Sequence, residues 1–268
     1  MNVASEAPAS DRAPWRAVAI PAEHGGGGLT LEPVLRGLLL TRSWSGLAIG
    51  LAAFLAFLVR TPLKLALVDR RRHRSLPRTQ LATRIAAIEL TLIAALGIGA
   101  LVGAGPAWLM PGAVALPLVG VELWFDIRSR SRRLVPELCG AIGIAAVAAA
   151  IVVAGDGSAS LAIGGWMILG ARALASIPYV RVQIMRSRRG DASRSGADTF
   201  SAVALVVAIA AAVIEPDVLL GSIVVTVLVV AQTVAVRREH IAPVKVIGIR
   251  QMVGGLLVVA ATAAGAAL

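Results

Sequence analysis

About nine apolar runs, separated by short polar breaks, divide this 268-residue sequence. Most have roughly the 20 residues that a helix needs to cross the hydrocarbon core of a membrane. Because 57% of the residues are hydrophobic and only 15% are charged, a water-soluble globular fold is excluded. The runs predict an all-α polytopic membrane bundle of about nine transmembrane helices, near residues 28–41, 45–68, 81–103, 107–127, 134–154, 159–180, 197–214, 217–236 and 248–267.

The domain organisation follows from the same pattern. Residues 1–18, "MNVASEAPASDRAPWRAV", are rich in Ala, Pro and Ser and lack the apolar core of a secretory signal, so we expect a flexible cytoplasmic tail. Residues 19–268 are expected to form a single transmembrane domain. The first helix is short and carries Glu32, Pro33 and Arg36, and we expect it to be broken or tilted after the "GGGG" of residues 25–28.

The polar breaks alternate in charge along the chain. "DRRRHRSLPR", "RSRSRR", "RVQIMRSRRGDASR" and "RREHIAPVKVIGIR" follow the second, fourth, sixth and eighth runs and hold 18 of the 26 basic residues. "TRSW", "GAGP", "GDGS" and "EPD", in the other breaks, hold one Arg between them. The positive-inside rule then predicts a cytoplasmic N-terminus and an external C-terminus. This clustering also explains the net charge of +11 without a nucleic-acid partner.

Ionisable residues within the apolar runs are candidates for a site, because charge at membrane depth is costly. Lys64 with Asp69, and Glu122 with Asp126, lie at the predicted cytoplasmic ends of two helices and each pair can face one interface. They are equally consistent with snorkelling side chains and ion pairs that only fix helix register. Arg172 needs a partner, either a carboxylate such as Glu122 or Glu32 or the phosphate of a substrate. The remaining candidates of this kind are Arg36, Arg84, Glu89 and Glu137.

Histidine and cysteine give little support for a metal or nucleophilic site. His24, in "PAEHGGGG", is a candidate acid, base or ligand, but no second His or Cys stands at ligand spacing, so no metal site is predicted from them. The single cysteine, Cys139, is expected to be a structural thiol. The chain contains no Walker loop, G-x-S-x-G, H-E-x-x-H or C-x-x-C motif, so the common NTPase, hydrolase and metalloprotease classes lose their usual support.

Four stretches carry a resemblance to a known family. "PAEHGGGGLTLEPVLRGLLL", "PLKLALVDRRRHRSLPRTQLA", "VPELCGA" and "ARALASIPYVRVQIMRSRRG" resemble the YwiC-like family of bacterial membrane proteins, over nearly the whole chain from about Pro21. This resemblance implies an integral protein of the bacterial cytoplasmic membrane, without implying an activity.

A second resemblance concerns architecture. Nine helices with long cytoplasmic loops after the second and sixth are similar to the UbiA family of membrane prenyltransferases. In that family, acidic motifs in these two loops hold Mg²⁺ against the diphosphate of an isoprenoid. Here only Asp69 remains in the first loop, and Asp191 and Asp198 stand seven apart in the second, so Mg²⁺ would have few of the oxygen ligands it needs. Arginines could instead hold a phosphate directly.

Two functional hypotheses follow. In the first, the bundle binds an isoprenoid or another phosphate-bearing lipid in a cavity open to the cytoplasm, with divergent or lost prenyltransferase-type activity. The two basic loops should then converge over one cavity. Its candidate head-group contacts are Lys64, Arg70, Arg74, Arg78, Arg172, Arg181 and Arg189, and its candidate acidic residues are Asp69, Glu122, Asp126, Asp191 and Asp198. In the second, the protein is a transporter or an accessory membrane protein without catalysis, and the same charges line a pathway or contact a partner.

Overall fold

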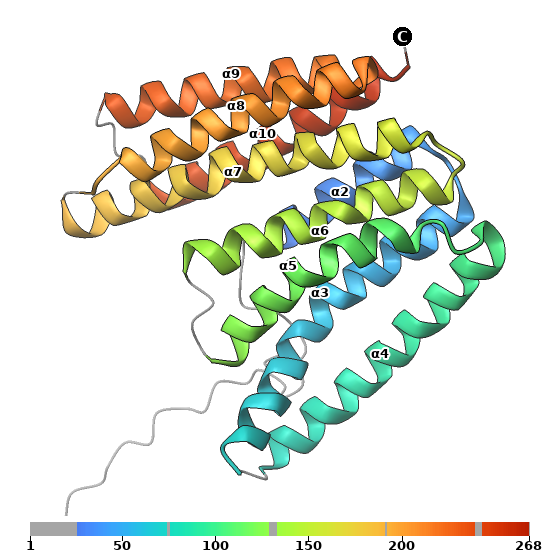
Figure 1. The fold of residues 1–268 in the computed structure, drawn as a ribbon. Coiled ribbons are helices and arrows are strands. Elements are labelled where there is room, and N and C mark those ends of the chain that lie inside the picture. The colour runs from blue at the N-terminus through green and yellow to red at the C-terminus, as the bar shows by residue number, and fades with distance from the viewer. Residues whose placement is uncertain (1–25, 74–75, 129–132, 191, 239–242, 268) are drawn as a thin grey trace, which may run out of the picture.

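The computed structural model describes residues 26–73, 76–128, 133–190, 192–238 and 243–267 (Figure 1). Over these ranges the backbone forms nine α-helices and one short 3-10 helix, and no strand. They are α2 (Gly26–Leu40), α3 (Trp44–Arg71), α4 (Pro77–Ala104), α5 (Leu109–Ile127), α6 (Leu134–Ala154), α7 (Ala159–Arg189), α8 (Ser195–Ile214), η1 (Pro216–Val218), α9 (Leu219–Arg237) and α10 (Val244–Gly265). The all-α prediction is confirmed. The expected tail, residues 1–18, lies outside the described residues.

Helices extend beyond the apolar runs at the basic ends. α3 continues to Arg71 and α7 to Arg189, whereas the runs end near residues 68 and 180. A long basic side chain can leave the apolar layer while its backbone stays helical, so hydropathy underestimates such ends. At the other side of the first basic loop, α4 begins at Pro77, because proline fits the first helical position, where no N–H partner is needed.

The centre of the bundle is formed by α6 and α7. About two thirds of the apolar span is buried in each of them, 67% in α6 and 61% in α7, against 11% in α4 and in α5. α6 contacts α2, α3, α5 and α7, while α8, α9 and α10 gather around α7 (Figure 1). α4 packs mainly on α3 and therefore exposes most of its surface. Alanines such as Ala148 and Ala149 are almost fully buried in α6, which lets neighbouring helices approach closely.

Helix α2 differs from the other eight described α-helices, all of which are long and apolar enough to span a membrane. The 15 residues of α2 that the structure describes rise only about 22 Å, less than the roughly 30 Å of a hydrocarbon core, and the residues before Gly26 lie outside the described ranges. α2 packs against α3, α6 and α10, with Gly37 so close to α6 that a Cβ there would lie 2.7 Å from Cβ of Ile151. One side of α2 is thus packed within the bundle, while Leu31 and Leu39 on its other side are exposed.

Helices follow one another antiparallel, so the C-terminal ends of α3, α5, α7 and α9 lie at one end of the bundle, called here the basic end (Figure 1). Arg71, Arg128, Arg188 and Arg237 belong to it. The chain's C-terminus lies at the opposite end (Figure 1). That the basic end faces the cytoplasm remains a prediction from the charge pattern.

Candidate functional site

Two carboxylates at the basic end of α5 are neutralised by two cations of α3. Nη1 of Arg60 lies 2.8 Å from Oε1 of Glu122, and its Nε donates to Oδ2 of Asp126 at 2.7 Å. Nζ of Lys64 lies 3.6 Å from Oδ1 of Asp126, whose side chain is only 1% exposed. Glu122 and Asp126 thus face one interface, as their spacing predicts, whereas Arg60 was not among the predicted site residues. The sequence did contain a signal for Arg60. Arg60 and Lys64 are four residues apart on α3, which is the same interval that separates Glu122 from Asp126 on α5.

Asp69 links the end of α3 to the first turn of α4. Oγ1 of Thr79 donates to Oδ2 of Asp69 at 2.6 Å, and Nη2 of Arg78 lies 3.6 Å from Oδ1. The Asp69 side chain is 4% exposed. Two of the candidate residues, Asp69 and Arg78, therefore meet, but in a pair that joins consecutive helices.

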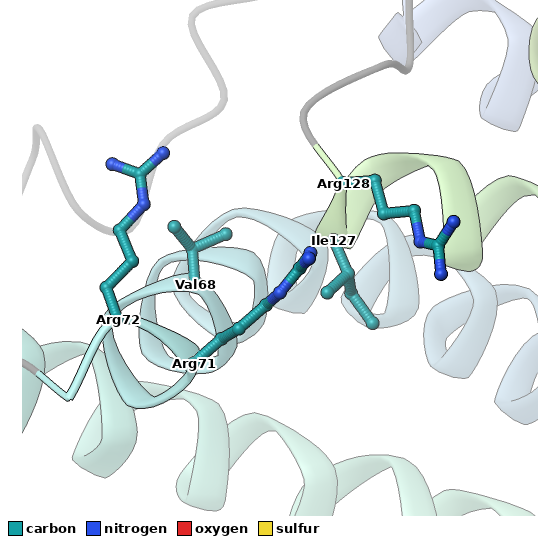
Figure 2. Close-up of a pocket in the computed structure, with 5 residues that line it drawn as sticks. All are labelled: Val68, Arg71, Arg72, Ile127 and Arg128. Carbon is teal, nitrogen blue, oxygen red and sulfur yellow. The ribbon is translucent and has the colours of Figure 1, made fainter.

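A pocket of about 330 Å³ lies beside these pairs, between the basic ends of α3 and α5. Its lining consists of Val68, Arg71 and Arg72 from α3 and the turn after it, and Ile127 and Arg128 at the end of α5. Figure 2 shows the guanidinium of Arg71 reaching toward Ile127 and Arg128, while the side chains of Arg72 and Arg128 extend to either side. The pocket thus offers a cationic rim next to two aliphatic side chains.

The arginines of this pocket carry no ion pair with a carboxylate in the part of the chain that the structure describes. Arg128 lies over the ring of Trp124, with Cζ 4.0 Å from the ring centroid, which orients its guanidinium. Nearby Glu122, Asp126 and Asp69 are already engaged by other cations. Arg71, Arg72 and Arg128 therefore form the local excess of positive charge.

None of the described residues predicted for the site lines this pocket. Arg70 is exposed on the last turn of α3 and does not line the pocket. On α7, Nη1 of Arg181 donates to Oε2 of Glu137 of α6 at 3.0 Å. Asp198 lies in the first turn of α8, where its charge favours the helix N-terminus. Arg74, Asp191 and His24 lie outside the described residues, as does the side chain of Arg189, whose backbone ends α7.

The basic ends of α3 and α7 do not converge. They lie on opposite flanks of the bundle in Figure 1, and no residue of α7 lines the pocket. The expected single site over both basic loops is therefore replaced by a smaller one between α3 and α5. Spacing along the sequence could not show this, because the pocket joins residues of two non-consecutive helices.

Arg172 forms its ion pair inside the bundle. Its Nη1 lies 2.9 Å from Oε2 of Glu32 on α2, with side chains only 6% and 7% exposed, and its Nη2 donates to the carbonyl of Gln251 on α10 at 2.7 Å. Of the two carboxylates considered for Arg172, Glu32 is thus the partner. Glu122 instead pairs with Arg60 and packs over Gly140 of α6.

A metal centre has no basis in the described ranges, which contain no group of three or more His, Cys, Asp and Glu side chains placed to share an ion. The free thiol of Cys139 is half-buried on α6.

The family relationship rests on the first half of the chain. A model of the family described as YwiC-like protein matches residues 20–153. The chain belongs to the YwiC-like family. No curated protein and no solved structure matches it.

The matched segment of this YwiC-like protein contains helices α2 to α6. It includes all five residues of the pocket and the Arg60, Glu122 and Asp126 cluster, whereas Arg172 and Arg181 lie beyond it on α7. The candidate site therefore lies within the part of the chain that the family model matches.

Proposed function

We propose that this YwiC-like membrane protein binds the phosphate-bearing head group of an amphiphile, an anionic lipid or an isoprenoid phosphate, in the pocket between α3 and α5. The observation that carries this function is the set of three arginines, Arg71, Arg72 and Arg128, around a 330 Å³ pocket without a carboxylate partner. Guanidinium groups hold phosphate through paired charge-assisted hydrogen bonds and need no metal.

The neighbouring charges support this assignment. Arg60 and Lys64 neutralise Glu122 and Asp126, and Thr79 and Arg78 hold Asp69. No nearby carboxylate is thus left to compete with a phosphate for the pocket arginines. A lone surface cluster would be attracted to any anionic leaflet, whereas a pocket can also distinguish one head group by the residues that line it.

The position of the pocket indicates where the apolar chains of the ligand would lie. Val68 and Ile127 lie next to the arginines where two candidate membrane spans end, so a head group bound here would keep its chains at the level of the hydrocarbon core. The proposal concerns binding. A transfer reaction would require an acceptor and an acid or base, for which the pocket lining offers no candidate.

The test is native mass spectrometry with lipid identification on the detergent-purified protein. The pocket variant carries Arg71→Gln, Arg72→Gln and Arg128→Gln. A matched control carries Arg188→Gln, Arg237→Gln and Arg238→Gln, which remove the same charge from exposed positions at the same end. We expect one phosphate-bearing lipid to co-purify with the wild type and the control, and its occupancy to fall at least about tenfold in the pocket variant.

Two results would count against the proposal. Equal loss of lipid in both variants would mean that the arginines act only through their summed charge at the membrane surface. An unspecific lipid mixture in all three proteins would mean that the pocket arginines only orient the protein in the membrane. Glycosylation or cysteine-labelling of the two termini would then show an altered topology in the pocket variant.

A further inference from the structure

Helix α10 is packed differently on the two sides of a glycine pair, Gly254 and Gly255. Five of the ten residues from Gly254 onward are buried, whereas Ile247 is the one buried residue among residues 244–253, all of which the structure describes. Residues 244–253 lie at the basic end and are called here the basic half of α10. The basic half is thus held to the bundle by much less buried surface than the rest of the helix.

The difference does not depend on which side of the helix faces lipid. Val244 and Gly248 lie 14 and seven residues before Val258 and Gly255, so all four are on the same side of α10. Val258 and Gly255 are buried. Val244, in contrast, is 58% exposed, and no described residue lies within 4 Å of a Cβ at Gly248. Even the inward side of the basic half is therefore loosely packed.

A buried polar face of α7 lies next to the basic half. Five polar residues of α7 follow one another at intervals of three or four and are all buried, namely Arg172, Ser176, Tyr179, Gln183 and Arg186. Tyr179 is packed in one buried cluster with Ile247, and its hydroxyl lies close to the side chain of Arg250. Nη2 of Arg172 donates to the carbonyl of Gln251. The basic half of α10 therefore covers polar side chains inside the bundle.

Gln183 shows that the polar face is incompletely hydrogen-bonded while it is covered. The residue is only 1% exposed, yet neither Nε2 nor Oε1 has a hydrogen-bond partner in the described part of the chain. The Tyr179 hydroxyl is close to Gln183 but completes no hydrogen bond with it. Enclosing an amide in this way costs free energy, which access of water would remove.

The glycine pair gives α10 a place to bend. Glycine leaves a helical backbone less restricted, and sharp bends in helices occur at such pairs of small residues. α10 is fixed at this point, since Glu32 of α2 occupies the space of a Cβ at Gly255 and Leu228 of α9 packs at Gly254. The second half of the helix is thus anchored where the basic half would turn.

We infer that the basic half of α10 is a lid, hinged at Gly254 and Gly255, which swings away from α7 and admits water from the basic end to the polar face beneath it. In the open state water reaches Tyr179 and Gln183, and Tyr179 is only two helical turns from Arg172 and its ion pair with Glu32. The lid shares no residue with the α3/α5 pocket, so either proposal can fail without the other.

The test is the reaction of a buried cysteine with a water-soluble maleimide in the full-length protein purified in detergent, after Cys139→Ser has removed the native thiol. Ser176→Cys places a thiol on the covered face of α7. Ser222→Cys is the matched control, because Ser222 is equally a buried serine but lies on α9 and bonds to the carbonyl of Ala208 on α8. We expect Ser176→Cys to react at least about tenfold faster than Ser222→Cys.

Two truncations compare the two sides of the hinge. Ile247→Ala removes the buried apolar side chain of the lid and should speed the labelling of Ser176→Cys at least about tenfold, because it weakens closure. Val259→Ala shortens a buried side chain beyond the hinge and should leave the labelling rate within about twofold.

Two alanine substitutions then test the hinge itself. Gly254→Ala restricts the backbone, and its methyl group meets only the end of the Leu228 side chain, so the labelling should slow about threefold. Gly248→Ala makes the same change within the lid, where a Cβ meets no described residue within 4 Å, and should leave the rate unchanged.

The proposal is overturned if Ser176→Cys reacts no faster than Ser222→Cys. Equal acceleration by Ile247→Ala and Val259→Ala would also overturn it, since the whole bundle would then be loosening. The same holds if Gly248→Ala slows the labelling as much as Gly254→Ala does, because the first turns of α10 would then unwind instead of moving as one body.

Discussion

The charges at the α3/α5 end and those around α2 use the same residue types but are neutralised differently. At the basic end, Arg60 and Lys64 are about one third exposed, and the excess arginines line an open pocket. In the interior, Glu32 and Arg172 are 7% and 6% exposed, and the guanidinium of Arg36 is fully enclosed. Solvent and head groups can balance the first set, whereas the second must be balanced within the protein. Substitutions should therefore cost much more in the interior.

Glu32→Gln should be the most destabilising of these changes. It leaves Arg172 buried without its carboxylate, so we expect a loss of about 3–5 kcal/mol in the free energy of unfolding. Reversible unfolding in mixed micelles, followed by tryptophan fluorescence, measures this. The double variant Glu32→Gln with Arg172→Met should recover most of the loss, and a double variant as unstable as the single one would contradict the pairing.

Gly165→Ala tests the contact of the Arg36 side chain with α7. The added methyl group would overlap the Arg36 guanidinium, so the same unfolding measurement should show a loss of about 1–3 kcal/mol. Gly170→Ala on the same helix is the control, because nothing lies within 4 Å of a Cβ there. If both alanines are tolerated equally, Arg36 does not occupy the position at Gly165.

Arg60→Gln tests the basic end. Asp126 would keep only the longer contact with Lys64, and Glu122 would lose its 2.8 Å partner, but solvent reaches Arg60. We expect a loss of about 1–2 kcal/mol, smaller than for Glu32→Gln. A loss as large as that of Glu32→Gln would mean that the two clusters contribute equally to stability despite their different exposure to solvent.

Arg181→Gln should have the smallest effect. Arg181 and Glu137 are each about one third exposed, at 33% and 35%, and pairs of this kind contribute at most about 1 kcal/mol. Raising the salt concentration should reduce the difference from the wild type further. A salt-independent loss above that value would show that the pair is shielded from solvent.

Much of the fold could be predicted from the sequence. Hydrophobic runs define where helices lie in a membrane protein, and all nine expected helices are present among the described residues. The candidate site was predicted less well. Asp69, Glu122 and Asp126 were recognised because an ionisable residue in an apolar run is conspicuous. Their partners were harder to find, since Arg60 contacts α5 across an interface that sequence distance does not reveal.

The pocket shows the same limit. Arg70, Arg74 and Arg78 were expected to act together because they share one basic loop, but Arg71 and Arg72 line the pocket. Arg128 joins them from α5, a helix that is distant in sequence. The burial of Arg36 likewise depends on Gly165, which reads in the sequence as one small residue among many.

The position of α2 has a consequence for how the protein is made in the cell. α2 is the first described helix to leave the ribosome, yet Glu32 packs at Gly255 of α10, the last. A short segment carrying two charges inserts poorly by itself, so its native surroundings exist only after synthesis is nearly complete. We therefore expect the packing of this first described helix against α10 to be completed only at the end of synthesis.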